Sequence, residues 1–519
     1  MLLAGVYGGT SFFLFVLNVL VHHRPFSYTQ IFPKHHIIVS LLKIMKKLNI
    51  LSYSSYSYMA VVAIVALLSF MLCGGEVCAQ LTMSLSVAYI AALAIYMKIF
   101  SPSRLGMVVL LIVAMLMSIG VVLNVYKFTV ESGGTLADPV LVNADAFRYF
   151  DQACEIYEGR PSVYRYTMPG LPLVTASLWL IFGKSIVYPL AMNVFLTLLS
   201  IIMSGRLAQI LLRGCVCGIS KECIASVAMM LTASISHFTG HGMLMLKEPM
   251  IYVSVLLVAI PLAHVYRYDR TTLWNIASFV VGNIMASISR PQLFFFFAVA
   301  IIMLAAYRMR NYWRTLMAMM AIAASCYFAG TIVTKYTSST HKDTVTGKGD
   351  MAANYLNNPD KRYDKYAKMI GSYYDLSMAQ RLARLPISAA VQYVVPFPWN
   401  YGRDTKFGYS QAYNHFAYPW FLVGGFVIYY FIFLWLRRGF PLKLWATWVL
   451  ICWIVVAYMF AGSVSRYVMP FVPLVMPLAV YVTVQLREAK MRKMFGLWFG
   501  SYAALMTIGL IICYQLQHQ

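Results

Sequence analysis

Long apolar runs recur from one end of the chain to the other, and they constrain the fold more than any other feature. As helices they are long enough to cross a hydrocarbon core of roughly 30 Å. The chain has 519 residues, of which 61% are hydrophobic and only 11% are charged, whereas a soluble protein keeps about a quarter of its residues charged. Helices satisfy their own backbone hydrogen bonds in lipid, so we predict an all-α polytopic membrane protein.

The apolar runs predict about 14 membrane spans. These expected spans are residues 4–22, 57–74, 83–99, 105–125, 187–212, 223–239, 249–266, 274–289, 292–307, 316–335, 419–436, 444–461, 468–486 and 495–513.

The net charge of +24 indicates membrane orientation, because the Lys and Arg residues lie in short links between apolar runs. A nucleic-acid-binding protein would carry them on a soluble domain, so no nucleic-acid partner is expected. With the N-terminus outside, every basic link falls in the cytoplasm, provided that the apolar run 171–183 does not cross. That run is too short to span comfortably and follows Pro169, so we predict a re-entrant or interfacial helix. The basic links are residues 22–47, 98–104, 213–221, 267–270, 308–314, 437–443 and 487–493.

This topology divides the chain into five segments and places two long polar loops on the outer face. The expected segments are the N-terminal spans (1–125), a first external loop with the non-spanning helix (126–186), a central bundle (187–335), a large external loop (336–418) and the C-terminal spans (419–519).

The first external loop concentrates carboxylates in a chain that otherwise avoids charge. Five of the 17 acidic residues lie between Asp138 and Glu158. In a helix Asp145 and Tyr149 share one face, with Asp151 around the side. A carboxylate at a membrane surface can act as a general base toward a hydroxyl nucleophile, so Asp145 and Asp151 are the candidate catalytic residues. A solvated amphipathic helix is the alternative interpretation.

Isolated cations at the outer ends of spans run against the usual cytoplasmic bias of Lys and Arg. Lys247 and Glu248 precede a span, Arg290 lies between two spans, and Arg466 follows another. Phosphate binding would explain the cations, because the guanidinium fork of arginine matches a phosphate group. Snorkelling of long basic side chains, or capping of the helix by a self-neutralising Lys–Glu pair, is the alternative.

The large external loop combines a polar segment, an expected amphipathic helix at 366–386 and an aromatic turn, "VVPFPWNYGRD", at 394–404. Trp399 and Arg403 in this turn, with Tyr467 after Arg466, are candidate substrate-binding residues because aromatic rings stack on sugars. Tyr and Trp residues are also ordinary components of the interfacial belt. No GxxxxGK motif and no GxGxxG motif after a strand occur, so no nucleotide is expected, and a divalent metal is left open.

The loop "NADAFRYFDQACEIYEGRPSVYRYTMPGLPLVTASLWLIFG" and the later "SRYVMPFVPL" resemble segments of GT-C-type membrane glycosyltransferases, in particular family-39-like enzymes of surface-polysaccharide assembly. The resemblance implies a GT-C-like bundle that uses a polyprenyl-phosphate or polyprenyl-diphosphate sugar donor. It implies that Asp145 is catalytic and that Arg466 contacts phosphate. The chain departs from the pattern in having about four spans before the acidic loop.

We therefore expect a glycosyltransferase of a bacterial inner membrane, with its active site facing the periplasm or exterior. Its expected partners are a polyprenyl-linked sugar donor, a glycan or lipid acceptor, and membrane lipids. The expected substrate-binding residues are Tyr149, Lys247, Glu248, Arg290, Trp399, Arg403, Arg466 and Tyr467. A repeat-unit polymerase of O-antigen or capsule is one alternative. A lipid-linked oligosaccharide flippase or transporter is another.

Overall fold

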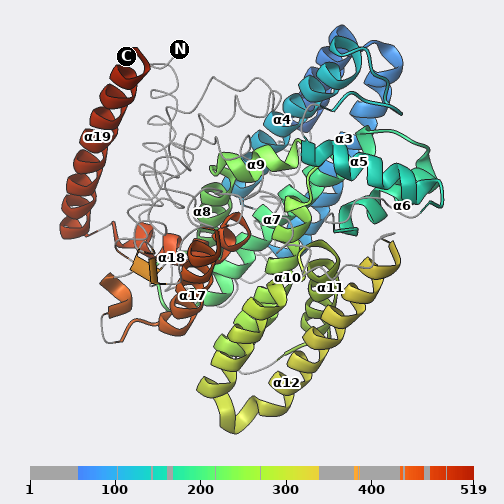
Figure 1. The fold of residues 1–519 in the computed structure, drawn as a ribbon. Coiled ribbons are helices and arrows are strands. Elements are labelled where there is room, and N and C mark those ends of the chain that lie inside the picture. The colour runs from blue at the N-terminus through green and yellow to red at the C-terminus, as the bar shows by residue number, and fades with distance from the viewer. Residues whose placement is uncertain are drawn as a thin grey trace, which may run out of the picture.

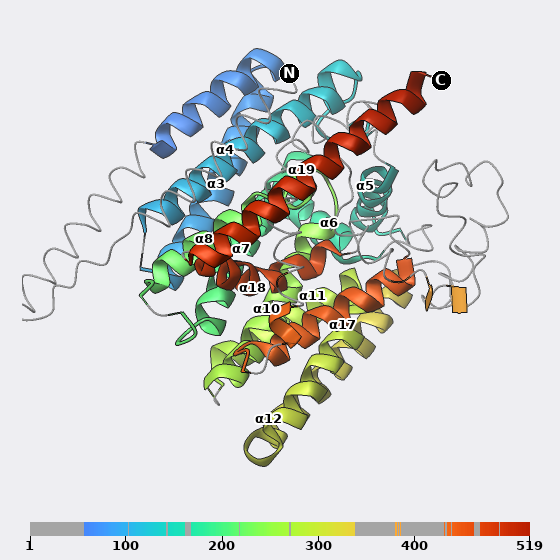
Figure 2. The same ribbon diagram turned by 90° about the vertical axis from the view of Figure 1, so that its left-hand side faces the viewer.

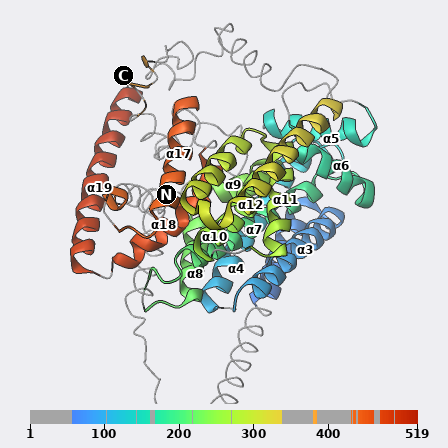
Figure 3. The same cartoon turned by 90° about the horizontal axis from the view of Figure 1, so that it is seen from below.

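The structure is a computed structural model in which every described element is a helix or a helical turn (Figure 1). It describes residues 57–101, 103–141, 144–160, 168–216, 218–268, 271–337, 379–380, 382–383, 385, 430, 433–436, 439–460, 468–486 and 488–518. In Figure 2, α3 (Gly75–Ile99) and α4 (Arg104–Tyr126) run alongside one another. Figures 1 and 3 show α19 (Ala489–His518) at the opposite edge of the molecule from α5 (Ala144–Tyr157) and α6 (Gly170–Phe182).

The remaining elements complete the bundle. They are the helix Ser57–Cys73, η1 (Lys127–Glu131), α7 (Val187–Leu211), α8 (Lys221–Ala233), α9 (Ser236–Gly242), α10 (Glu248–Tyr268), α11 (Leu273–Ser289), α12 (Leu293–Thr337), α17 (Lys443–Phe460), η8 (Met469–Phe471) and α18 (Val472–Gln485).

The helices identify a helical membrane protein, as the composition predicts. Among the described residues, five helical segments are long and apolar enough to cross a membrane, or six if the sharply bent pair Met469–Gln485 and Ala489–Ser501 forms one span. Five shorter apolar helices accompany them. The expected span 4–22 and most of 419–436 lie outside the described residues. Serine and threonine N-caps help to define helix starts, as where Ser103 accepts a hydrogen bond from the backbone N–H of Gly106.

Three of the basic links gather at one end of the bundle, which we call the basic end. The Arg267 guanidinium after α10 donates to the backbone carbonyl of Arg213 after α7. At the same end, the Lys98 ammonium near the end of α3 lies 5.7 Å from the ring centre of Trp274 at the start of α11. These contacts join the links 98–104, 213–221 and 267–270 at one end of the helices.

The opposite end, which we call the acidic end, carries α5 and α6, the segment 243–247 and the junction of α11 with α12. Asn193 near the start of α7 donates to the carbonyl of Leu246, with a nitrogen–oxygen distance of 2.8 Å. Asn124 near the end of α4 donates to the carbonyl of Met243 at 3.0 Å. The ends of α4 and α7 away from the basic end therefore meet the chain just before α10.

Helix α6 begins and ends at the acidic end. A Cβ atom added to Gly170, its first residue, would lie 2.6 Å from the Ser289 hydroxyl at the end of α11. The carbonyl of Phe182, its last residue, accepts a hydrogen bond of 3.2 Å from Tyr188 in the first turn of α7. Gly183 follows with φ +87°, a conformation that favours glycine and ends the helix.

Helix α12 doubles back on itself. The rings of Phe294 and Tyr327 stack with centroids 5.0 Å apart, although 33 residues of straight helix would separate them by about 50 Å. Tyr307, near the middle of α12, contacts Tyr266 at the basic end. The two arms correspond to the separate expected spans 292–307 and 316–335.

One expected span is not a continuous helix. Residues 223–239 were predicted as one helix, but α8 ends at Ala233 and α9 starts at Ser236. The Ser234 hydroxyl donates to the carbonyl of Leu231, a local bond that competes with continuation of the helix. The chain then turns into a short α9 and an irregular segment before α10.

Candidate functional site

Helix α5 is amphipathic and presents one apolar face to α6. The buried residues Ala146, Tyr149, Phe150, Ala153 and Cys154 follow helical spacing. Phe150 and Tyr157 both place their rings edge-on to the ring of Trp179 in α6, at centroid distances of 5.1 and 6.0 Å. This aromatic contact holds α5 against α6.

Asp145 and Asp151, the predicted catalytic residues, are both half-buried on α5. They lie six residues apart, so their side chains diverge by about 120° around the helix axis. Asp145 lies in the first turn and is nearly in line with the buried Tyr149 one turn later. Asp145 is therefore the carboxylate on the side of α5 that carries Tyr149, and Asp151 points in a different direction.

Lys247 connects α5 to the rest of the acidic end. Its ammonium nitrogen lies 5.8 Å from the ring centre of Tyr149, within the range of a cation–π contact. Lys247 is the last residue before α10, and Tyr149 is one helical turn from Asp145. The contact thus joins two predicted site residues from distant segments, and Asp145 lies one turn along α5 from it.

Glu248 and Arg290 form an ion pair beside this contact. Their closest nitrogen–oxygen distance is 3.8 Å, and their side chains are 2% and 13% exposed. Glu248 opens α10 and Arg290 follows α11, so the pair joins the two helices at the acidic end. The sequence predicts an anionic partner for Arg290, and the carboxylate of Glu248 is one such partner.

Lys184 is a site neighbour that the sequence analysis missed. Its ammonium lies 5.7 Å from the ring centre of Phe150 and 6.0 Å from that of Trp179. Burial raises the pKa of the Cys154 thiol, and a hydrogen bond and the charge of Lys184 partly oppose that effect. A single lysine in a short loop resembles an ordinary interfacial residue, so only its position just after the short apolar run 171–183 could have pointed to it.

Four predicted substrate-binding residues, Trp399, Arg403, Arg466 and Tyr467, lie outside the described residues. The nearest described element to Arg466 and Tyr467 in the sequence is η8. Phe471 of η8 contacts the ring of Phe296 in the first turn of α12, at a centroid distance of 4.7 Å.

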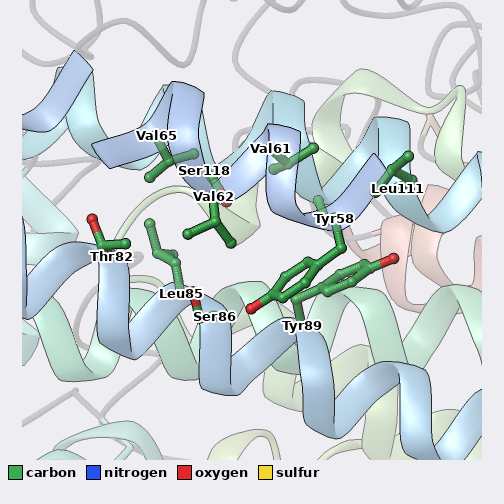
Figure 4. A pocket seen from close by; sticks show the side chains of 11 residues that line it. Tyr58, Val61, Val62, Val65, Thr82, Leu85, Ser86, Tyr89, Leu111 and Ser118 are labelled. Carbon is green, nitrogen blue, oxygen red and sulfur yellow. The ribbon is translucent and has the colours of Figure 1, made fainter. Parts of the chain in front are cut away.

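Other polar groups do not form a metal centre in the part of the chain that the structure describes, where no three His, Cys, Asp or Glu side chains are suitably grouped. His241 of α9 instead contacts the Tyr252 hydroxyl through Nδ1 at 2.6 Å. Figure 4 shows a cavity between the helix Ser57–Cys73, α3 and α4, in which the rings of Tyr58 and Tyr89 stack. Its volume of about 20 Å³ suits a single water molecule, and no predicted site residue lines it.

Comparison of the chain with protein-family models, with curated proteins and with solved structures finds no match.

Proposed function

We propose that the protein is a membrane glycosyltransferase with a GT-C-like bundle of about 14 spans. It transfers a sugar from a polyprenyl-phosphate or polyprenyl-diphosphate donor to a glycan or lipid acceptor. In this proposal the acidic end faces the periplasm or exterior of a bacterial inner membrane, and α6 lies along the membrane surface. The resemblance of the acidic loop to GT-C enzymes motivates the reaction class.

The observation that carries the proposal is the contact of Lys247 with Tyr149. It brings a cation to the helix that carries Asp145, at the end of an apolar bundle where a lipid-linked substrate has its polar group. A carboxylate can accept the acceptor's proton and a cation can stabilise a leaving phosphate, so the two groups suit transfer from a lipid phosphate.

In the proposed reaction, Asp145 accepts the proton of the acceptor hydroxyl while the acceptor oxygen attacks the anomeric carbon of the sugar. The bond from that carbon to the phosphate oxygen breaks, and the lipid phosphate leaves with the bonding electrons. Lys247 stabilises the negative charge that develops on the leaving phosphate. Arg466 and Tyr467, with Trp399 and Arg403, are proposed to complete the donor and acceptor sites.

In the polymerase alternative, Arg290 binds the diphosphate of a lipid-linked substrate. Glu248 already lies 3.8 Å from Arg290 and is almost fully buried, so a diphosphate there would have to compete with a carboxylate. This competition favours transfer of a single sugar over polymerisation.

The flippase alternative is favoured by one observation, the broken path from α8 through α9 to α10. Interrupted helices of transporters often place free backbone carbonyls at a binding site. In this protein the carbonyls of Met243, Leu244 and Leu246 accept hydrogen bonds from buried asparagines. Their acceptor capacity is thus directed at protein groups, which favours a structural use of the break.

The test uses purified protein in lipid nanodiscs with polyprenyl-linked sugars and candidate acceptors. The proposal predicts a product that gains one sugar, together with release of the polyprenyl phosphate or diphosphate. A ladder of repeat units would identify a polymerase. Movement of intact lipid-linked oligosaccharide across a proteoliposome membrane, without cleavage, would identify a flippase.

A further inference from the structure

The backbone between α9 and α10 is irregular although it is buried in the apolar interior. Met243, Leu244, Met245 and Leu246 are each at most 5% exposed. Carbonyl groups in such a place need hydrogen-bond donors, because neither water nor a regular helix supplies them. The source of those donors therefore decides how this segment is held.

Two buried asparagines supply the side-chain donors, beside a backbone hydrogen bond of 2.8 Å from the Leu246 N–H to the carbonyl of Leu244. The Asn193 amide nitrogen donates to the carbonyls of Leu244 and Leu246, at 2.7 and 2.8 Å. The Asn124 amide nitrogen donates to the carbonyl of Met243 at 3.0 Å. Both asparagines are fully buried, and each lies in a mainly apolar helix.

These hydrogen bonds have an energetic cost, which falls on the side-chain oxygen of each asparagine. The side-chain oxygens of Asn193 and Asn124 are buried and have no hydrogen-bond partner within the described ranges. Burying an amide oxygen in this way is unfavourable. Simple packing does not require a buried amide oxygen. We therefore infer that the two asparagines hold the carbonyls of Met243, Leu244 and Leu246 in place.

The clamped backbone leads directly to the candidate site. Leu246 is followed by Lys247, whose ammonium faces the Tyr149 ring, and then by Glu248, which pairs with Arg290. The neighbouring Gly242 is packed so closely against Thr197 and Met117 that a Cβ atom would overlap both. The chain is thus held in place both before Lys247, at Gly242 and Leu246, and after it, at Glu248.

We propose that Asn193 is a positioning residue that aims Lys247 at α5. Its two hydrogen bonds fix the carbonyls on either side of Met245 and so set the direction in which the chain enters α10. Asn124 supports the same segment from α4. This inference rests on the proposed function for its catalytic consequence, but the placement of Lys247 has a readout of its own.

The first test is substitution of Asn193 by aspartate, which keeps the shape but turns an oxygen toward two carbonyl oxygens. We expect sugar transfer to fall about tenfold to a hundredfold, since small displacements at a reacting centre have effects of this order. In the Lys247→Ala background, Asn193→Asp should cause no further loss, because the two residues act as one unit. Independent losses that multiply would overturn the inference.

The matched control is Asn283→Asp. Asn283 is equally buried, but its amide donates within its own helix to the carbonyl of Phe279. We expect this change to leave the dependence on Lys247 unaltered. Where Asn193→Asp does not fold, Asn193→Gln replaces it, since glutamine keeps both N–H groups but moves them one methylene further out.

The second test does not depend on transfer. The rate at which acetic anhydride modifies Lys247 is measured by mass spectrometry in the unaltered protein and in Asn193→Asp, with Lys184 as the internal reference. We expect a change of several-fold at Lys247 and none at Lys184. An unchanged Lys247 rate would overturn the positioning role. A changed rate in a protein that transfers no sugar would leave positioning in place and overturn the proposed function.

Discussion

The carboxylate of Glu248 lies 3.8 Å from the guanidinium of Arg290, and this pair joins the first residue of α10 to the residue that follows α11. Both side chains are largely shielded from water. Desolvation of two charges is costly, so such a pair contributes to stability mainly by having both partners present. The pair lies immediately beside Lys247, which links the stability of the acidic end to the candidate site.

Removal of Glu248 alone is therefore expected to destabilise the protein. Glu248→Ala leaves a shielded guanidinium without its carboxylate, and breaking a buried pair in this way costs about 3 kcal/mol. Equilibrium unfolding in bicelles measures the change. Glu158→Ala is the control, because Glu158 pairs with Arg160 at the surface, where both side chains are well exposed and salt bridges contribute little. Equal losses in the two variants would contradict the role of the buried pair.

The close approach of α6 to α11 gives a second prediction. A methyl group at Gly170 would lie 2.6 Å from the Ser289 hydroxyl and 3.0 Å from the Ile288 carbonyl oxygen. We expect Gly170→Ala to lower stability by about 1–3 kcal/mol through overpacking. Gly500→Ala, in α19, meets nothing within 4 Å and should be neutral or slightly stabilising. Adding Ser289→Ala should recover part of the loss at Gly170, and no recovery would argue against this contact.

The position of α6 predicts a pattern of labelling from the two sides of the membrane. In a background without native cysteines, Glu158→Cys and Lys184→Cys flank α6, while Arg213→Cys lies at the basic end. A membrane-impermeant maleimide should label the first two from one side and the third only from the other. Labelling of Glu158→Cys and Lys184→Cys from opposite sides would mean that α6 crosses.

The buried thiol of Cys154 predicts a dependence of stability on pH. Burial holds its pKa above the ordinary value of 9.0, against the opposing effect of Lys184. The unfolded chain therefore releases this proton first, so the stability that the thiol contributes is present below pH 9 and is lost as the pH rises through the folded-state pKa. Cys154→Ala should lose less stability than the unaltered protein between pH 8 and pH 10. Identical losses would show that Cys154 does not contribute.

The membrane helices were predictable because span length and end residues are local properties. The expected spans 105–125 and 274–289 nearly coincide with α4 and α11, and both helices have Ser or Thr caps. The irregular segment between α9 and α10 was not predictable. It depends on hydrogen bonds that Asn124 and Asn193 make across the bundle, and apolar periodicity does not reveal such contacts.

The candidate site was partly predictable for a similar reason. Sequence spacing alone places Asp145 and Tyr149 on one helix face. The position of Lys247 just before an expected span predicts a substrate-binding cation. The pairing of Glu248 with Arg290 needed the packing of α10 against α11, which sequence spacing does not give. Lys184 lies against aromatic rings of two helices, and its contact with α5 depends on tertiary packing that sequence spacing does not give.

The measurement that tests the central claim most directly compares sugar transfer by the unaltered protein, Asp145→Asn and Asp138→Asn. All three are assayed in nanodiscs with a polyprenyl-linked sugar that the unaltered protein uses. Loss of a general base predicts a rate about 10²–10⁴-fold lower for Asp145→Asn. Asp138 precedes α5 in the same loop, and its replacement should leave the rate unchanged. Transfer by Asp145→Asn at the unaltered rate would contradict the account.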